Sequence, residues 1–278
     1  MMRIRYGFNI KIDVTQPMTL LTALDVEQAR RGDIIHERPL MTGSVGHVER
    51  YTDGFGNLCR RIQALPGTVS LSLEGIIQDI GKPDPVVPDA EQLDVSQLPF
   101  ETLPFLLASR YCETEFLNQT AWARFGHIQG GWARVQAICD FVHDHVTFGY
   151  PNARATRTAF EAFTERVGVC RDFTHLAVAL CRCMNIPARY CNGYLGDIGI
   201  PADPAPMDFN AWFEAYLGDR WYVFDARHNM PRIGRITVAR GRDAMDIPML
   251  QTFGTHTLRR FEVITEEVVE EVYHLAAE

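Results

Sequence analysis

This 278-residue chain lacks long apolar runs and an excess of positive charge. No stretch approaches the ~20 apolar residues of a membrane-spanning helix. Residues 1–13 alternate charged and apolar side chains, so we expect no signal peptide. Lys plus Arg number 27 against 35 for Asp plus Glu, which gives a net charge of −8. That balance does not favour nucleic acid or an anionic membrane as a partner, and we expect neither.

The cysteines also lack the number and spacing of a disulfide framework. The chain has seven cysteines, an odd number that does not suggest a disulfide framework. Because we expect no export signal, we interpret them as reduced thiols of a cytoplasmic protein. They are Cys59, Cys112, Cys139, Cys170, Cys181, Cys183 and Cys191.

Motifs for nucleotides and metals are absent too. Gly54-Phe55-Gly56 is too short for a dinucleotide loop and fits a hairpin turn. His143 and His145 are two positions apart, so on a helix they do not face the same way, and we interpret them as solvated residues at a helix end. No Asp-rich calcium loop is present. We therefore expect neither a cofactor nor a metal.

The first third of the chain has the pattern of β-strands. Residues 3–14 alternate with period two, and shorter candidates follow between Gly, Pro and Asn turns. We expect an all-β domain over residues 1–81, a sandwich or partial barrel, and then a Pro-rich linker over 82–104. The shorter candidate strands are 33–37, 47–52, 58–64 and 69–75.

From residue 105 the pattern becomes a mixture of helices and strands. Apolar side chains recur at helical spacing in several segments, and alternating segments follow them. We therefore expect an α+β core over residues 105–278. The predicted helices are 111–117, 131–145, 158–164 and 170–184, and the predicted strands are 188–195, 208–217, 220–226 and 258–269.

Cys170 follows a glycine and a valine and begins the predicted helix over 170–184. Unpaired backbone N–H groups and the positive end of the helix dipole lie at such a start, and they favour the reactive thiolate. An arbitrary free cysteine is more often a small buried apolar residue. Cys170 is therefore a candidate nucleophile only if suitable partners lie elsewhere in the chain.

The predicted hairpin over residues 208–226 supplies candidate partners. Pairing continued outward from its Gly-Asp turn makes Asn210 and Asp225 diagonal neighbours on one face, within reach of a hydrogen bond. The same register places His228 on the opposite face, unless the strand ends early. A nucleophilic thiol needs a base and a group that orients the base. A helix packed on this face would present Cys170 to both side chains.

These residues resemble the transglutaminase-like superfamily, whose members share a papain-like cysteine core. The resemblance implies the order nucleophile Cys, base His and orienting Asp, with Cys170 and Asp225 in the first and third positions. It also implies an N-terminal β domain of the kind that bacterial members carry. The matching words are Gly168-Val169-Cys170-Arg171-Asp172-Phe173, residues 176–180, Asn185-Ile186-Pro187-Ala188-Arg189-Tyr190, Gly193-Tyr194-Leu195, Asn210-Ala211-Trp212-Phe213-Glu214 and Trp221-Tyr222-Val223-Phe224-Asp225.

The second position departs from the family pattern, because Asn210 stands where the family has a histidine before Ala-Trp. An amide has no useful basicity near neutral pH, so it cannot take the proton of the thiol. Three explanations remain open: another histidine is the base, site electrostatics alone hold a thiolate, or activity is lost and the pocket binds a ligand. His175 lies about 140° round the helix from Cys170 and is poorly placed. The candidate bases are His175, His228, His143 and His145.

The resemblance implies thiol acyl chemistry on a peptide or protein amide through a Cys170 thioester. Water is the simpler acceptor, and crosslinking of glutamine to an amine is the less favoured one. An oxyanion hole needs the Cys170 backbone N–H plus another donor, for which Tyr150 is a candidate, with Trp212 and His228 as auxiliary residues. The alternative is a binding or scaffold protein that keeps the fold and has lost the base. The oligomeric state stays open.

Overall fold

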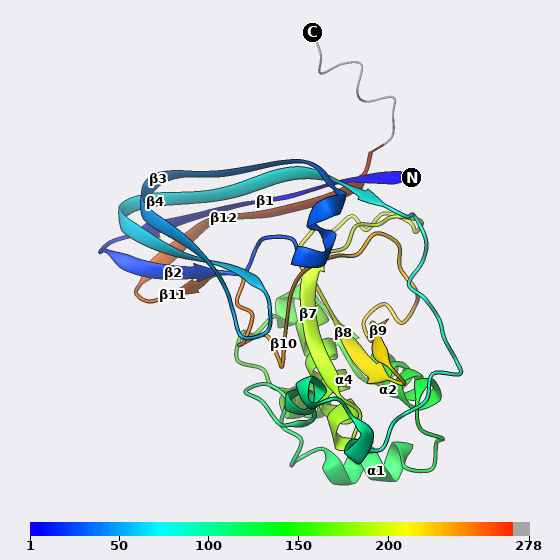
Figure 1. Cartoon of the computed structure of the whole chain (residues 1–278). Helices are drawn as coiled ribbons and strands as arrows, with labels where there is room; N and C mark the ends of the chain where they lie inside the picture. The colour runs from blue at the N-terminus through cyan, green and yellow to red at the C-terminus, as the bar shows by residue number, and fades with distance from the viewer. Residues whose placement is uncertain (269–278) are drawn as a thin grey trace.

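The computed structural model describes residues 1–268, and its upper part in Figure 1 is one long antiparallel sheet. The alternation predicted for residues 3–14 is confirmed, since every second side chain from Ile4 to Val14 is buried. The sheet has six strands, with β4 between β1 and β3. They are β1 (Met2–Val14), β2 (Met18–Thr22), β3 (Ile34–Thr52), β4 (Leu58–Asp79), β11 (Gln251–Thr252) and β12 (His256–Glu267).

The short strands predicted in this region are in fact the halves of two long ones. Residues 33–37 and 47–52 fall in or beside β3, and residues 58–64 and 69–75 fall in β4. Gly43 and Gly67 take φ values of 83° and 126° where the β3–β4 register shifts. Glycine tolerates that conformation, so the two strands bend there without ending. The expected sandwich or partial barrel is therefore a single bent sheet.

The last strand lies far from the position expected for it. The strand predicted at 258–269 is present as β12, but β12 pairs with β1 along its length, from Ile4 opposite Glu267 to Val14 opposite His256. The C-terminal strand thus completes the first sheet, whereas the division at residue 105 assigned it to the core. Val269, the final residue of the predicted strand, lies outside the described residues.

The lower part of the molecule is an α+β core, as the sequence predicted (Figure 1). A four-stranded antiparallel sheet in the order β10-β7-β8-β9 packs against α4, and α4 packs against the other helices. The strands are β7 (Ala188–Tyr194), β8 (Asn210–Leu217), β9 (Arg220–Phe224) and β10 (Ile236–Gly241), beside a short parallel pair, β5 (Thr147–Phe148) and β6 (Val167–Gly168). The helices are α1 (Asn118–Phe125), α2 (Trp132–His145), α3 (Ala159–Glu165) and α4 (Cys170–Cys183).

One predicted helix is wrong. Residues 111–117 form no helix, and α1 begins only at Asn118. The backbone of Ser109 and Cys112 forms a β-bridge, and the Tyr111 N–H donates to the Asp243 carboxylate at 2.8 Å. These long-range bonds occupy backbone groups that a helix would need, so they override the local periodicity.

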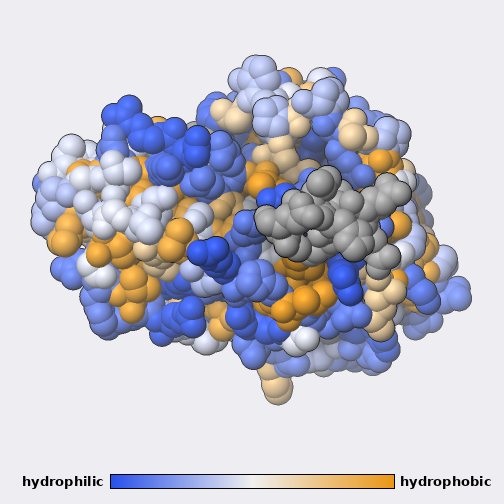
Figure 2. All heavy atoms as spheres, turned by 90° about the horizontal axis from the view of Figure 1, so that it is seen from above, coloured by the Kyte–Doolittle hydropathy of each residue, from blue (hydrophilic) through white to orange (hydrophobic). Residues whose placement is uncertain are grey.

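Two hydrophobic cores hold the layers together. The first joins the inner face of the long sheet to residues of β7 and β10, and the second fills the space between the smaller sheet and the helices. From above, the face of the long sheet carries hydrophobic patches between hydrophilic ones (Figure 2). No helix in the described part of the chain has the length and apolar character to cross a membrane.

The segment between the two sheets has little regular structure. It contains two short 3-10 helices, Val95–Gln97 and Phe100–Leu106, and no strand of its own. Its first residues run along the core, where Pro83 forms an isolated bridge with Ile233. The segment therefore contacts the residues that follow β9, close to the candidate site.

Candidate active site

Cys170 is the first residue of α4, as the sequence predicted. The Val169 N–H donates to the Asp172 carboxylate at 2.9 Å, which caps the helix start. Asp172 is buried and pairs with Arg157 at 3.0 Å. This buried ion pair fixes the first turn of α4 and with it the position of the thiol.

The thiol of Cys170 lies against β8. Its Sγ is 4.0 Å from the Phe209 carbonyl oxygen, and Cys170 is half-buried whereas the other six cysteines are buried. Burial raises the pKa of Cys170 to about 11, and the Arg227 guanidinium and the backbone N–H groups of Ala211 and Arg171 oppose that rise only in part. Burial therefore opposes the helix start, which we expected to favour the thiolate, and the net effect is a raised pKa.

Asp225 follows the end of β9 and accepts four hydrogen bonds. Its Oδ1 accepts from the backbone N–H groups of Arg227 at 3.1 Å and His228 at 3.0 Å. Its Oδ2 lies 2.8 Å from His228 Nδ1 and accepts from Arg235 Nη2 at 2.9 Å. Burial alone would raise the pKa of Asp225, but Arg235 and the bonds from His228 hold it well below its usual range. The carboxylate is therefore ionised.

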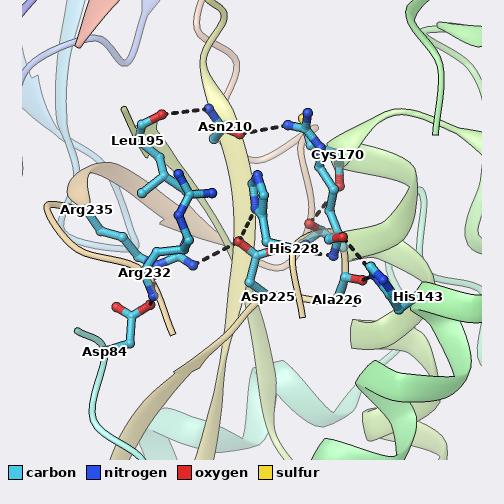
Figure 3. Close-up of polar contacts among 12 residues, drawn as sticks. Asp84, His143, Cys170, Leu195, Asn210, Asp225, Ala226, His228, Arg232 and Arg235 are labelled. Atoms are coloured by element: carbon cyan, nitrogen blue, oxygen red, sulfur yellow. Dashed lines mark hydrogen bonds and ion pairs between the residues drawn. The ribbon is translucent and has the colours of Figure 1, made fainter. Parts of the chain in front are cut away.

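An ionised Asp225 fixes the tautomer of His228. A carboxylate only accepts hydrogen bonds, so in the neutral ring Nδ1 carries the proton and Nε2 is the acceptor. Figure 3 shows the ring of His228 extending from Asp225 towards Asn210. An imidazole with a basic nitrogen and an orienting carboxylate has the properties of a general base.

The predicted hairpin register is confirmed near its turn and fails beyond it. Leu217 pairs with Arg220 and Phe213 with Phe224, but β9 ends at Phe224, before Asp225. The backbone then turns, because Asp225 Oδ1 bonds the N–H groups that follow it. This turn brings His228 back to the carboxylate, whereas the extended register had placed it on the opposite face.

Asn210 does not bond Asp225 in the described structure. Its amide N–H groups donate to the carbonyl oxygens of Leu195 at 3.3 Å and Asp208 at 3.2 Å. Its Oδ1 accepts from Arg227 Nη1 at 3.0 Å (Figure 3). The guanidinium carbon of Arg227 also lies 3.9 Å from the ring centroid of Phe148. Asn210 therefore fixes an arginine beside the thiol.

The other candidate bases are occupied elsewhere. His175 is fully buried between Tyr111 and Tyr190, its Nε2 accepts from the Ala244 N–H at 3.2 Å, and burial holds its pKa well below the usual range. The side chain of His145 bonds the Phe163 carbonyl oxygen at 2.7 Å. Within the described residues, His228 is the candidate base that bonds a carboxylate.

His143 has a different place in the same region. Its Nδ1 lies 2.8 Å from the Arg227 carbonyl oxygen and 3.3 Å from that of Ala226, so it donates to the turn that carries His228 (Figure 3). A helix of the core thereby supports the turn after β9. Among residues 1–268, no group of three or more His, Cys, Asp or Glu side chains could hold a metal ion.

Tyr150 and Trp212 lie in different surroundings. Tyr150 is 40% exposed, packs edge-on against Phe148, and burial of its ring raises its pKa. Trp212 is fully buried, and the guanidinium carbon of Arg235 lies 5.0 Å from its ring centroid. Tyr150 therefore stays accessible from solvent, whereas Trp212 packs behind the Asp225–Arg235 pair.

Three residues of the site were missed by the sequence reasoning: Arg227, Arg235 and Asp84. Arg227 gives a usable signal, because it follows Asp225 by two positions in a segment that leaves the strand. Arg235 and Asp84 are 151 positions apart, and their side chains meet at 2.8 Å. No local pattern could reveal that pairing.

Comparisons with known proteins identify similar domains and structures. A family model described as the transglutaminase-like superfamily matches residues 119–226, which include Cys170 and Asp225 and end before His228. A crystal structure of a candidate cysteine protease from Cytophaga hutchinsonii has a TM-score of 0.83 and 30% sequence identity, covering 96% of this chain and 91% of that chain.

Two further matches cover less of this chain. The uncharacterized protein ML0607 of Mycobacterium leprae (strain TN) is 31% identical over 97 residues, which make up 34% of this chain and 34% of that protein. The match thus spans about a third of that relative. The periplasmic domain of TgpA from Pseudomonas aeruginosa has a TM-score of 0.40 at 14% identity, covering 80% of this chain and 88% of that chain. From the family model and the near-full-length relative together, the chain belongs to the transglutaminase-like superfamily.

Proposed function

We propose that this protein is a thiol-dependent amide hydrolase or acyltransferase in which Cys170 is the nucleophile and His228 is the base. The observation that carries the proposal is the 2.8 Å contact between His228 Nδ1 and Asp225 Oδ2. It supplies the oriented base that Asn210 cannot supply. Arg227, the neighbour of His228, bonds Asn210 and lies close enough to the thiol for its charge to lower the pKa of Cys170.

The chemistry follows from the protonation states. The Cys170 thiol is neutral at pH 7, so its proton passes to His228 Nε2 as Sγ attacks the amide carbonyl carbon. The imidazolium then protonates the departing amine, the C–N bond breaks, and a thioester remains on Cys170. In the second half of the reaction, His228 takes a proton from water, and the hydroxyl oxygen attacks the thioester carbonyl carbon. The C–S bond then breaks, and the sulfur regains a proton from the imidazolium.

Asn210 has a different role in this proposal from the one that its sequence position implies. It holds Arg227 beside the reacting sulfur, where a positive charge stabilises negative charge on sulfur or on the carbonyl oxygen. The Cys170 N–H belongs to the first turn of α4, whose N–H groups have no partner within the helix. It is therefore a candidate oxyanion donor, and Tyr150 is a second candidate.

The substrate class that fits best is a peptide or protein amide, with water as acceptor. The relative from Cytophaga hutchinsonii, described as a candidate cysteine protease, supports this assignment. A second candidate function is a binding module that keeps the fold without turnover. The raised pKa of the Cys170 thiol favours that alternative, because a buried neutral thiol is a weak nucleophile unless a base acts on it.

An acylating, thiol-directed activity probe distinguishes the two functions. We expect wild-type protein to be labelled at Cys170, Cys170→Ala to lose the label, and His228→Gln to react about 10²–10⁴-fold more slowly, the usual contribution of a general base. Peptide mapping by mass spectrometry locates the label. Cys183→Ala, which removes a buried thiol at the other end of α4, is the matched control and should label like wild type.

Two results would contradict the enzyme proposal. Label that persists in Cys170→Ala would exclude Cys170 as the nucleophile. Equal labelling of wild type and His228→Gln would show that no base acts on the thiol, and the binding module would then be the better description.

A further inference from the structure

The segment that leaves the first sheet runs beside the residues that follow His228. Pro83 and Ile233 form a β-bridge, and the Asp84 N–H donates to the Arg232 carbonyl oxygen at 2.9 Å. In return, the Arg232 N–H donates to Asp84 Oδ2 at 2.9 Å. These bonds fix the backbone and the carboxylate of Asp84 against the core, so Asp84 occupies a defined position there.

A line of ion-paired side chains with alternating charge connects the Asp84 carboxylate to His228, the proposed base. Arg235 Nε donates to Asp84 Oδ2 at 2.8 Å, and Arg235 Nη2 donates to Asp225 Oδ2 at 2.9 Å. The same Asp225 oxygen bonds His228 (Figure 3). The exposed fractions of the side chains are 16% for Asp84, 6% for Arg235 and 3% for Asp225, so solvent screens this line poorly.

We propose that Asp84, on the segment between the two sheets, is a positioning residue of the active site that acts on His228 through Arg235 and Asp225. This inference deepens the proposed function and rests on it for the role of His228. Asp84 lies outside residues 119–226, the range of the family model. The catalytic apparatus therefore includes part of the chain that precedes the common core.

Geometry gives the first reason for this role. A guanidinium presents its donors as a rigid fork and readily binds one carboxylate through two of them. Asp84 holds the Nε side of the guanidinium in place, and in this orientation only Nη2 bonds Asp225, whereas Nη1 has no hydrogen-bond partner among the described residues. Without Asp84, Arg235 is free to bind Asp225 with two donors and to compete with His228 for the shared Oδ2.

Charge gives the second reason. Arg235 beside Asp225 opposes the positive charge that His228 acquires when it takes a proton, and Asp84 offsets that opposition. Arg232 contributes positive charge from the same segment and is itself offset in part by Asp197 at 3.6 Å. The charged and titratable groups around the base are Asp225, Arg227, Arg232, Arg235, Asp84, Asp197, Asp208, Cys139, His143, Tyr150 and Cys170.

Asp84→Asn tests the proposal because it removes the charge and keeps the size. We expect the ascending limb of kcat/KM against pH to move to lower pH by about 0.5–1 unit, the effect of one nearby charge at an effective dielectric constant of about 20–40. We expect kcat to fall about three- to tenfold and KM to change little, because the base becomes weaker and less well oriented. Asp84→Glu, which restores the charge, should recover most of the shift.

Asp79→Asn is the matched control. Asp79 is a buried carboxylate at the end of the first sheet and, like Asp84, pairs with an arginine, in its case Arg30 at 3.2 Å, but it does not bond Arg235. A structural loss at this junction should therefore appear in the unfolding midpoint of Asp79→Asn without a shift of the pH profile. Equal shifts in the two variants would overturn the proposal.

The titration of the His228 ring, followed by NMR without substrate and assigned with His228→Gln, separates this inference from the proposed function. A lower titration midpoint in Asp84→Asn supports the coupling even if the Cys170 probe fails. A midpoint equal to that of wild type overturns the coupling even if Cys170 proves to be the nucleophile.

Discussion

Two buried carboxylates, one in β8 and one directly after the neighbouring strand β9, have the same kind of burial and different chemistry. Glu214 in β8 pairs with Arg189 at 2.6 Å and Arg240 at 2.9 Å, and Asp225 after β9 pairs with Arg235 and His228. Burial alone would raise the pKa of both carboxyl groups, but Arg240 and Arg189 lower that of Glu214 and Arg235 lowers that of Asp225. Burial and pKa direction therefore do not separate the two sites.

The partners separate them. Arginine stays protonated at every physiological pH, so the Glu214 cluster has a fixed charge state. Arg240 also pairs with Glu27, a residue beside the first sheet, so the Glu214 cluster joins the two sheets. At Asp225 one partner is a histidine, whose ring can take up and release a proton, and Cys170 is the half-buried thiol of the candidate site. The comparison teaches that a perturbed carboxylate marks a functional site only when a partner can transfer a proton.

The largest effect that the comparison predicts is in Asp225→Asn. We expect kcat/KM to fall about 10³–10⁴-fold, because an amide at this position no longer fixes the His228 tautomer that leaves Nε2 basic. The measurement is kcat/KM on a generic amide substrate, normalised to the concentration of folded protein. A loss below about tenfold would contradict the role assigned to Asp225.

Glu214→Gln is the control for that prediction. Removing the negative charge of Glu214 from a buried ion cluster should lower the free energy of unfolding, measured by urea denaturation, by about 3–5 kcal/mol. We expect kcat/KM per folded molecule to stay unchanged. The lowered pKa means that the Glu214 contribution is present above the unfolded value near pH 4.3 and is lost as pH falls through the folded value. The variant should therefore lose stability less steeply than wild type in acid.

A smaller effect concerns the thiol. Because burial raises the pKa of Cys170 to about 11, its rate of alkylation by iodoacetamide should rise about tenfold per pH unit between pH 7 and pH 10. Mass spectrometry of the Cys170 peptide gives the rate. A rate that is already constant below pH 7 would reveal a thiolate–imidazolium pair and would contradict the neutral thiol.

The smallest effect is expected for Asn210→His. Since His228 already supplies the base, a second histidine should not raise turnover, and the lost bond to Arg227 should lower kcat/KM about tenfold, the equivalent of one hydrogen bond of about 1.4 kcal/mol. Asn210→Asp, which keeps an acceptor for Arg227, is the matched control. A rise in kcat/KM for the histidine variant would restore position 210 as the site of the base.

Local patterns explain which elements the sequence predicted correctly. The alternation of buried side chains in β1 and the helical spacing of apolar side chains in α2 and α4 depend on residues close together in the sequence. The Gly-Asp turn likewise sets the register of β8 and β9 near it. The same reasoning failed where a distant contact decides the backbone. Asp243 accepts a hydrogen bond from the Tyr111 backbone N–H, and residues 111–117 form no helix. The C-terminal strand β12 pairs with β1, although the two strands are far apart in the sequence.

The sequence by itself determined the family, the cysteine at a helix start and the carboxylate at the end of the hairpin segment, because short-range order and spacing encode all three. Only the tertiary structure decided which histidine reaches that carboxylate, that burial raises the pKa of the Cys170 thiol, and that Asp84 lies behind Arg235. These properties depend on burial and on contacts between residues far apart in the chain, and such contacts form only when the layers pack together.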